Sequence, residues 1–260
     1  MENKNTLLLI TRCTRPENLP LIFESIIKTK ARIYASNIFI NWYIIADKSK
    51  FPIDMDFSDF YRYADDCTTI YNIDTKFFVG CSVDEFDYGC SVANVGLSEF
   101  DKANDSQTKH HTLVYLLDDD NILHDNFYKC VIKAFDSVKN PTIFNITWKD
   151  GTFIDPLQFL LRKSHKHCHG IDSAQMLLPL DLLISVNGYS GGVKIDCTTL
   201  DKIIDKCNTY TIVDIVGASY NSINSKRISY DEVVEHPTKW YNSETDEFNI
   251  QYSNGEKTAY

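Results

Sequence analysis

The chain has 260 residues, enough for one large domain or for two joined halves. Its 26 basic and 36 acidic side chains give a formal net charge of −10 without any lysine- or arginine-rich block, which argues against nucleic acid as a partner. No apolar run approaches the ~20 residues that a membrane-spanning helix needs, so no integral membrane segment is expected.

The eight cysteines form no CxxC pair, and the N-terminal apolar run is too short and too polar-flanked for a secretory signal. The even number of cysteines would permit disulfides only in a secreted chain. We therefore expect reduced thiols in a cytoplasmic protein.

Strand-like and helix-like segments alternate through the first part of the chain, a pattern that predicts an α/β fold with a mostly parallel sheet and helices on both faces. The first strand is expected over residues 6–11. A helix start follows, with Thr14 as N-cap, Pro16 in the first turn and Glu17 completing a capping box. Five apolar residues at helical spacing predict its buried stripe: Leu19, Ile22, Phe23, Ile26 and Ile27.

Further strands are predicted over residues 38–46, 68–73, 113–117, 142–148 and 209–216. Further helices are predicted around Val92, Val95 and Phe100, and over residues 124–138 and 196–207. Residues 149–151 indicate a turn, and residues 187–192 a glycine-rich loop of the kind that lines a site. The polar composition of residues 241–260 indicates a partly disordered tail.

The strongest chemical signal lies where the apolar strand 113–117 ends in three consecutive aspartates, Asp118 to Asp120. Ligands of open α/β sheets bind beyond the carboxyl ends of the strands. Three adjacent carboxylates repel one another, and a hard cation such as Mg²⁺ or Mn²⁺ that bridges to phosphates relieves the repulsion. The pattern predicts a metal–diphosphate site, with a solvated acidic turn as the alternative. Arg12, Arg15 and Lys76 are candidate positive charges beside it.

Several of these segments together resemble nucleotide-sugar glycosyltransferases of the GT-A fold, especially the inverting family 2 type, over roughly residues 6–205. The opening Ile-Thr-Arg-Cys-Thr-Arg-Pro-Glu-Asn-Leu at residues 10–19 is similar to that family's first strand and turn, although Arg12 and Cys13 stand where small or aromatic residues are usual. Asp47 ends the second strand like the family's nucleobase-contacting aspartate. Residues 118–120 match its DxD element. The family's G…AxNxG helix is matched by Gly89, Ala93, Asn94 and Gly96.

The resemblance implies a GT-A (Rossmann-like) domain over residues 1–240, with a nucleotide-sugar-binding half (1–121), an acceptor-binding half (122–240) and a tail (241–260). It implies Mn²⁺ or Mg²⁺ as cofactor, with Asp120 as metal ligand, Asp118 shared between the metal and the ribose, and His236 as a C-terminal ligand. The implied partners are a nucleotide-sugar donor, UDP-linked by expectation, and a glycan, protein or small-molecule acceptor. The implied nucleotide-binding residues are Thr11, Arg12, Arg15, Asp47, Asn94, Asp118 and Asp119.

An inverting transfer needs a general base near the acceptor hydroxyl. The resemblance points to Asp196, after the glycine-rich loop, although Ile195 replaces the acidic neighbour usual there; Asp196 as a helix cap is the alternative. Asp172 is the second candidate base. If neither acts, the mechanism would be retaining.

Four other functions compete with this interpretation. A zinc site is suggested by four close ligand-type residues, His165, His167, Cys168 and His169. Because no second ligand pair follows, a polar loop is favoured over a zinc site. A haloacid dehalogenase-type phosphatase carries its Asp-x-Asp on the first strand. An EF-hand needs glycine where Leu123 stands. The remaining alternative is a degenerate GT-A domain that binds a nucleotide-sugar or a partner without turnover.

Overall fold

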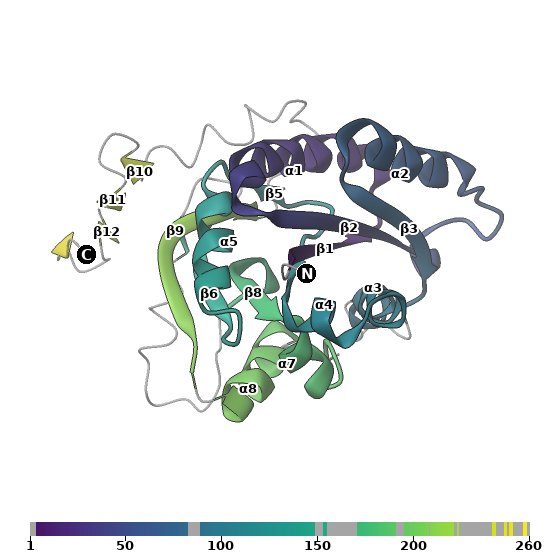
Figure 1. Ribbon diagram of the computed structural model, residues 1–260. Helices are drawn as coiled ribbons and strands as arrows, with labels where there is room; N and C mark the ends of the chain where they lie inside the picture. The colour runs from purple at the N-terminus through teal and green to yellow at the C-terminus, as the bar shows by residue number, and fades with distance from the viewer. Residues whose placement is uncertain are drawn as a thin grey trace.

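A nine-stranded mixed sheet forms the centre of the molecule, and helices lie on both of its faces (Figure 1). The computed structural model describes residues 4–82, 89–148, 153–154, 171–190, 195–207, 209–220, 223, 241–242, 247–248, 250–251 and 257–258. This arrangement confirms the predicted α/β class with a mostly parallel central sheet.

Four parallel strands build the N-terminal part of the sheet, in the spatial order β3 (Asp74–Gly80), β2 (Ile38–Asp47), β1 (Asn5–Cys13) and β4 (Thr112–Leu116). Strand β1 is apolar throughout its middle because its residues alternate between two cores. Leu7 and Leu9 belong to one core, and Leu8 and Ile10 belong to the other. A central parallel strand is covered on both faces, which explains the continuous apolar run.

The sheet continues beyond β4 with antiparallel pairing to β8 (Met176–Pro179), which is followed by β6 (Thr142–Trp148), β9 (Thr211–Tyr220) and β5 (Ile122–Leu123). Strand β7 (Phe153–Ile154) pairs with β6. Near the C-terminus, β10 (Tyr241–Asn242) pairs with β11 (Glu247–Phe248), and β12 (Ile250–Gln251) pairs with β13 (Lys257–Thr258). The mixed half therefore follows the parallel half in space as it does in sequence.

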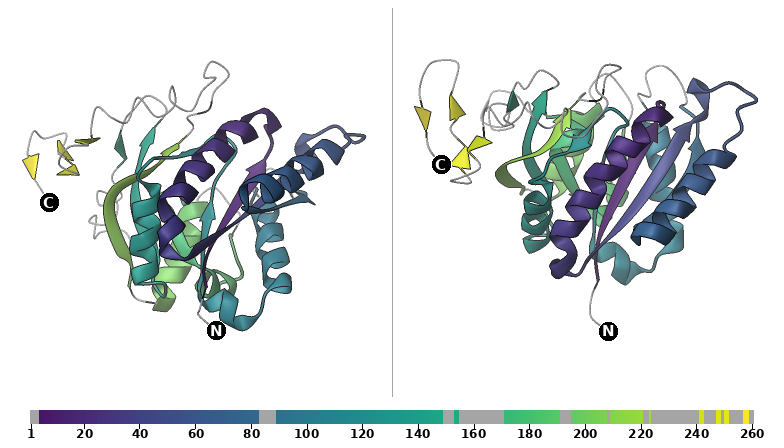
Figure 2. Two further views of the ribbon diagram at one scale, coloured as in Figure 1. Left: turned by 45° about the horizontal axis from the view of Figure 1, so that its top comes forward. Right: turned by 90° about the horizontal axis from the view of Figure 1, so that it is seen from above.

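Helices divide between the two faces of the sheet (Figure 2). One core is closed by α1 (Leu19–Ile33), α2 (Ser58–Tyr71) and α5 (Phe127–Asp136). The other is closed by α3 (Cys90–Ala103), α7 (Leu180–Ser185) and α8 (Ile195–Cys207), with α4 (Ser106–His110) leading into β4. Short 3₁₀ turns connect elements: η1 (Pro16–Asn18), η2 (Tyr34–Ser36), η3 (Lys48–Lys50) and η4 (Ser173–Gln175). The result is a three-layer α/β/α arrangement.

The predicted third strand over residues 68–73 is wrong, because most of that segment is the last part of α2. The β-branched run Thr68, Thr69 and Ile70 suggested a strand. The helix instead buries Phe60, Ala64 and Cys67 at helical spacing and ends at Asn72 in the left-handed conformation. Burial of this face decides the structure over local propensity. The third strand is β3, directly after.

The predicted capping box at the start of α1 is also wrong. The chain enters the helix through η1, whose N-cap is Arg15, and no side chain caps it. The Thr14 hydroxyl instead donates to the distant carboxylate of Asp119 at 2.8 Å. The hydroxyl that was expected to accept from the first turn of the helix therefore donates to a distant residue.

The other predicted elements are found with shifted ends. Helix α5 starts at Phe127, later than predicted, because residues 124–126 form a turn in which the Phe127 N–H donates to the His124 carbonyl at 2.9 Å. Strand β9 extends beyond residue 216 to Tyr220. Leu19, Ile22, Phe23 and Ile26 are buried in α1 as predicted, and Ile27 packs beside them.

None of the described helices is long and apolar enough to cross a membrane. Six cysteines have described side chains, and these six are free thiols: Cys13, Cys67, Cys81, Cys90, Cys130 and Cys207.

Candidate functional site

The carboxyl ends of the parallel strands bring most of the predicted residues to one edge of the sheet. Strands β1 and β4 run parallel, with Ile10 opposite Leu116, so the residues that follow each strand emerge together. Asp47 ends β2 on the same side, paired in register with Gly80 at the end of β3. This is the edge where open α/β sheets bind ligands.

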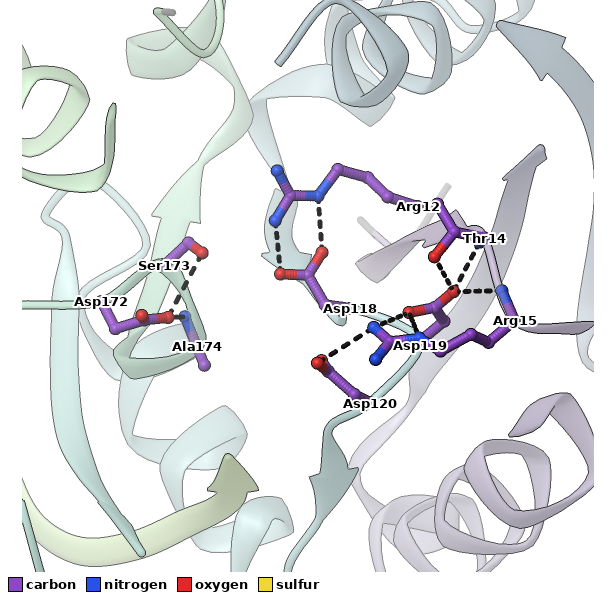
Figure 3. A network of polar contacts seen from close by, with 9 residues as sticks. All are labelled: Arg12, Thr14, Arg15, Asp118, Asp119, Asp120, Asp172, Ser173 and Ala174. Carbon is purple, nitrogen blue, oxygen red and sulfur yellow. Dashed lines mark hydrogen bonds and ion pairs between the residues drawn. The ribbon is translucent and has the colours of Figure 1, made fainter. Parts of the chain in front are cut away.

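Asp119 is the most firmly held of the three aspartates (Figure 3). Its Oδ2 accepts hydrogen bonds from the backbone N–H of Thr14 at 2.5 Å, from that of Arg15 at 2.6 Å and from the Thr14 hydroxyl at 2.8 Å. Its Oδ1 accepts from Arg15 Nε at 3.0 Å and Nη2 at 2.5 Å. Asn18 also donates to the Asp119 carbonyl at 2.7 Å. Buried and fully engaged, this carboxylate fastens the turn after β1 to the end of β4.

Asp118 is paired with Arg12, the residue that departs from the family pattern (Figure 3). Arg12 Nε donates to Asp118 Oδ1 at 2.5 Å, and Nη2 donates to Oδ2, which makes a two-pronged ion pair. Gly89 leaves the room for this guanidinium: a Cβ there would lie 3.0 Å from Arg12 Cδ, and its φ of +79° favours glycine. The pair shields one side of the Asp118 carboxylate.

Asp120 shares Arg15 with Asp119, because Arg15 Nη2 lies 2.9 Å from Asp120 Oδ2. Burial and then the nearby charge of Asp118 raise the pKa of Asp120, and Arg15 offsets part of that effect. Asp120 thus carries a negative charge that its surroundings compensate incompletely. That is the condition under which a carboxylate favours an additional cation.

Asp47 is held by the two loops that follow β2 and β3. Its Oδ1 accepts from Ser49 N–H at 3.0 Å, the Ser49 hydroxyl at 2.6 Å and Ser82 N–H at 3.2 Å, and its Oδ2 accepts from the Ser82 hydroxyl at 2.6 Å. Burial raises the pKa of Asp47, but these hydrogen bonds outweigh burial and lower it. The aspartate is therefore ionised and orders both loops at this edge.

Asn94 connects α3 with the start of the glycine-rich loop. Its amide donates to the Tyr189 carbonyl at 2.9 Å and accepts from the Tyr189 N–H at 2.8 Å. Gly188, with φ of +76°, lies so close that a Cβ would approach Asn94 Oδ1 to 2.3 Å. Asn94 therefore positions this loop, and any contact of Asn94 with a nucleotide stays a prediction.

Asp172 is the N-cap residue of η4 (Figure 3). Its Oδ1 accepts from Ala174 N–H at 2.9 Å, and its own N–H donates to Gln175 Oε1 at 3.0 Å, completing a capping box. Burial and the charges of Asp172, Asp118 and Asp120 raise the pKa of Tyr220. The Tyr220 hydroxyl thus lies near both Asp172 and the aspartate triad, which connects the two across the site.

Other predicted residues lie elsewhere. Thr11 is buried, and its hydroxyl accepts from Trp42 Nε1 at 2.9 Å. In the sheet, Phe78 on β3 is level with Arg12 on β1, and Lys76 lies two residues before Phe78, further from the carboxyl ends of the strands. The Lys76 ammonium instead contacts the Tyr43 hydroxyl at 3.3 Å. Lys76 therefore does not supply charge to the triad.

Some predictions fall on positions that the structure does not describe. Asp196 is in the first turn of α8, but its side chain is outside the described residues, and so are His236 and the cluster of His165, His167 and His169.

Three contributors escaped the sequence analysis: Asn18, Ser49 and Ser82. Each donates to a buried aspartate or its backbone, as described above. Ser49 stands two residues after Asp47, a local pattern that could have identified it. Asn18 and Ser82 have no local signal, because only the sheet brings them to their partners.

The donor set fits a divalent cation that keeps most of its ligands from water and phosphate. Within the described ranges no three His, Cys, Asp or Glu side chains form a complete metal cage. Mg²⁺ commonly needs only one or two protein carboxylates when substrate phosphates supply the rest. Asp120 and Asp118 would be those carboxylates.

Comparison with known proteins addresses the fold. No family model matches the sequence, and no curated protein matches it. Among solved structures, TarS from S. aureus aligns with a TM-score of 0.53 at 9% identity, covering 83% of this chain and 36% of TarS. This chain thus spans about a third of the length of TarS.

Two further structures align over most of both chains. One is a 4-diphosphocytidyl-2C-methyl-D-erythritol synthase from Anaerococcus prevotii, with a TM-score of 0.48 and 14% identity, covering 92% of this chain and 99% of that one. The other, from Bacillus anthracis, is assigned as a glucose-1-phosphate thymidylyltransferase, with a TM-score of 0.48 and 9% identity, covering 91% and 94%. The likeness to TarS establishes the fold, and activity has to be argued from the site. The chain has a GT-A-like α/β fold with a mostly parallel mixed sheet flanked by helices.

Proposed function

We propose that this protein is a metal-dependent glycosyltransferase that moves a sugar from a nucleotide-diphosphate donor to an acceptor hydroxyl. The observation that carries the proposal is the aspartate triad after β4 at the ligand-binding edge of a GT-A-like sheet, with Asp47 at the end of β2 on the same edge, on the other side of β1. A nucleotide laid along this edge would pass from Asp47 toward Asp118 and Asp120.

In this proposal the two partly exposed aspartates hold the cation. Asp120 is the principal ligand, because burial and Asp118 leave its charge incompletely compensated. The cation supplies Lewis-acid stabilisation of the departing diphosphate. Arg15, whose side chain is 44% exposed beside Asp120, adds a positive charge on the same side.

The acceptor hydroxyl needs a base, and Asp172 is the carboxylate that the described geometry favours. Tyr220 connects it electrostatically with Asp118 and Asp120, so Asp172 lies on the triad's side of the fold. Its capping of η4 fixes its position. Asp196 stays the second candidate. A base at this place would make the transfer inverting.

A non-catalytic nucleotide-sugar-binding module is the second candidate function. The observation in its favour is that Arg12 and Arg15 already pair with all three aspartates. Such a module would bind a donor and leave it intact.

The first experiment is a thermal-shift panel of UDP, GDP and CDP and their sugars, each with Mn²⁺ or with EDTA. A ligand at a hundred times its dissociation constant adds about 2.7 kcal/mol, a shift of about 5–10 °C for a chain of this size. We expect stabilisation by one nucleotide only with Mn²⁺, and loss of it in Asp120→Asn. No shift with any of them would overturn the proposal.

The products then separate the candidate reactions. A glycosyltransferase incubated with its nucleotide-sugar releases the nucleoside diphosphate, by transfer or by slow hydrolysis. A nucleotidyltransferase releases pyrophosphate from a nucleoside triphosphate and a sugar phosphate. A binding module releases neither while retaining metal-dependent affinity.

A further inference from the structure

Arg12 has a place in this site that the proposed function does not explain. Its guanidinium covers both oxygens of Asp118 from one side through two charge-assisted hydrogen bonds. The two side chains are only 18% and 17% exposed, so solvent screens the pair weakly. A cation that approached Asp118 would meet a positive charge already in contact with it.

The charges of the whole cluster show why this matters. Arg12 and Arg15 place two positive charges against the three negative charges of Asp118, Asp119 and Asp120. Asp119 has no accessible face, since its side chain is 3% exposed. The remaining charge is too small to attract a divalent ion strongly while both arginines stay in place.

The fold also provides a defined position for the Arg12 side chain. It stands next to last in β1, and its side chain lies against Gly89, where a Cβ would lie 3.2 Å from Nη1. Gly89 is the N-cap of α3, so the Arg12 guanidinium lies at the ligand-binding edge of the sheet. A planar guanidinium with five donors matches phosphate oxygens as well as carboxylate oxygens.

We propose that Arg12 is a built-in counter-ion that competes with the divalent cation for Asp118 and transfers to the donor diphosphate when the cation binds. The inference rests on the proposed donor and cation sites. It makes the two ligands interdependent: the cation displaces Arg12, and the diphosphate receives it. Because binding coupling is reciprocal, each ligand strengthens the other by the same factor.

The first test measures Mn²⁺ alone, without nucleotide, by the loss of the free-ion EPR signal. Arg12→Gln should bind Mn²⁺ at least about tenfold more tightly than the unmodified protein, which corresponds to about 1.4 kcal/mol. Arg62→Gln is the matched control, because Arg62 is an exposed arginine that pairs with Asp59 on α2. It should leave Mn²⁺ affinity unchanged. Equal affinities for Arg12→Gln and the unmodified protein would overturn the proposal.

A double variant locates the competition. Adding Asp118→Asn to Arg12→Gln should remove the gain in Mn²⁺ affinity, because the carboxylate that Arg12 guards is then gone. A gain that persists in the double variant contradicts competition at Asp118. Arg12→Lys keeps the positive charge but lacks the planar guanidinium that pairs with both carboxylate oxygens. We therefore expect its Mn²⁺ affinity to lie between those of the unmodified protein and Arg12→Gln. Melting curves of each variant verify the fold.

The second test uses UDP, GDP and CDP at saturating Mn²⁺. For whichever nucleotide stabilises the unmodified protein, Arg12→Gln should bind at least about tenfold more weakly, although it binds Mn²⁺ more tightly. These opposite changes would not follow from general destabilisation. Undiminished nucleotide affinity would overturn the transfer of Arg12 to the diphosphate.

The outcomes also separate this inference from the proposed function. If Mn²⁺ binding depends on Asp120 but not on Arg12, the cation site stands and the counter-ion role falls. If neither the unmodified protein nor any variant binds Mn²⁺ at millimolar concentration, both the proposed cation site and the counter-ion role of Arg12 are wrong.

Discussion

Asp118, Asp119 and Asp120 are consecutive and chemically identical, but their side chains lie in two different environments. Asp119 points into a cradle formed by Thr14, Arg15 and Asn18, and its side chain is 3% exposed. Asp118 and Asp120 are each 17% exposed and are held mainly by arginine side chains. The cradle buries Asp119, whereas Asp118 and Asp120 stay partly exposed, and we propose these two as the ligand-binding pair.

This difference teaches that a run of like residues need not act as one unit. Backbone N–H donors come from the chain itself and cannot leave, so Asp119 is bound permanently. Arginine side chains can rotate away, so Asp118 and Asp120 can exchange partners. The predictions below break or sharpen this division.

Replacing Asp119 should have the largest effect on stability. Asp119→Ala removes the acceptor of five hydrogen bonds and leaves the Arg15 charge and two backbone N–H groups without it. Loss of a buried, charged acceptor of this kind costs about 3–5 kcal/mol. Urea unfolding measures the change. A loss below about 1 kcal/mol would show that the cradle does not hold the turn after β1.

Acid should destabilise the protein through His124, four residues after the triad. Burial lowers the pKa of His124 from 6.5 to about 4, so the folded state keeps this imidazole neutral while the unfolded state binds a proton. Stability is then lost as pH falls from 6.5 to 4, by about 3 kcal/mol in total.

Urea unfolding at a series of pH values tests this sign and size. His124→Gln should flatten the slope between pH 6.5 and 4. An unchanged slope in that variant would mean that carboxylates, the three aspartates among them, cause the acid sensitivity instead of His124.

Replacing Asp118 should affect stability less than replacing Asp119, and it should weaken ligand binding. The Arg12 and Asp118 side chains are 18% and 17% exposed, so their pair is less buried than Asp119, and Asp118→Asn should lower the free energy of unfolding by about 1–2 kcal/mol. The same variant should reduce Mn²⁺-dependent nucleotide binding in the thermal-shift panel. A destabilisation as large as that of Asp119→Ala would erase the distinction between the two regions.

The sequence predicted the sheet well because periodicity and burial agree locally. The apolar runs of β1, β2 and β4 and the stripe of α1 are found where expected. Residues 68–73 failed because their β-branched composition favours a strand, while the buried face of Phe60, Ala64 and Cys67 requires a helix. Local propensity is weaker than the burial of a helix face.

The sequence alone determined that carboxylates cluster beyond a buried strand, since strand ends and aspartates are both local features. Only the tertiary structure decided what each carboxylate does. Arg12 lies 106 positions from Asp118 and Arg15 lies 104 positions from Asp119, so no sequence window contains either pair. The parallel pairing of β1 with β4 brings these residues together, and it leaves Asp119 buried while Asp118 and Asp120 stay partly exposed.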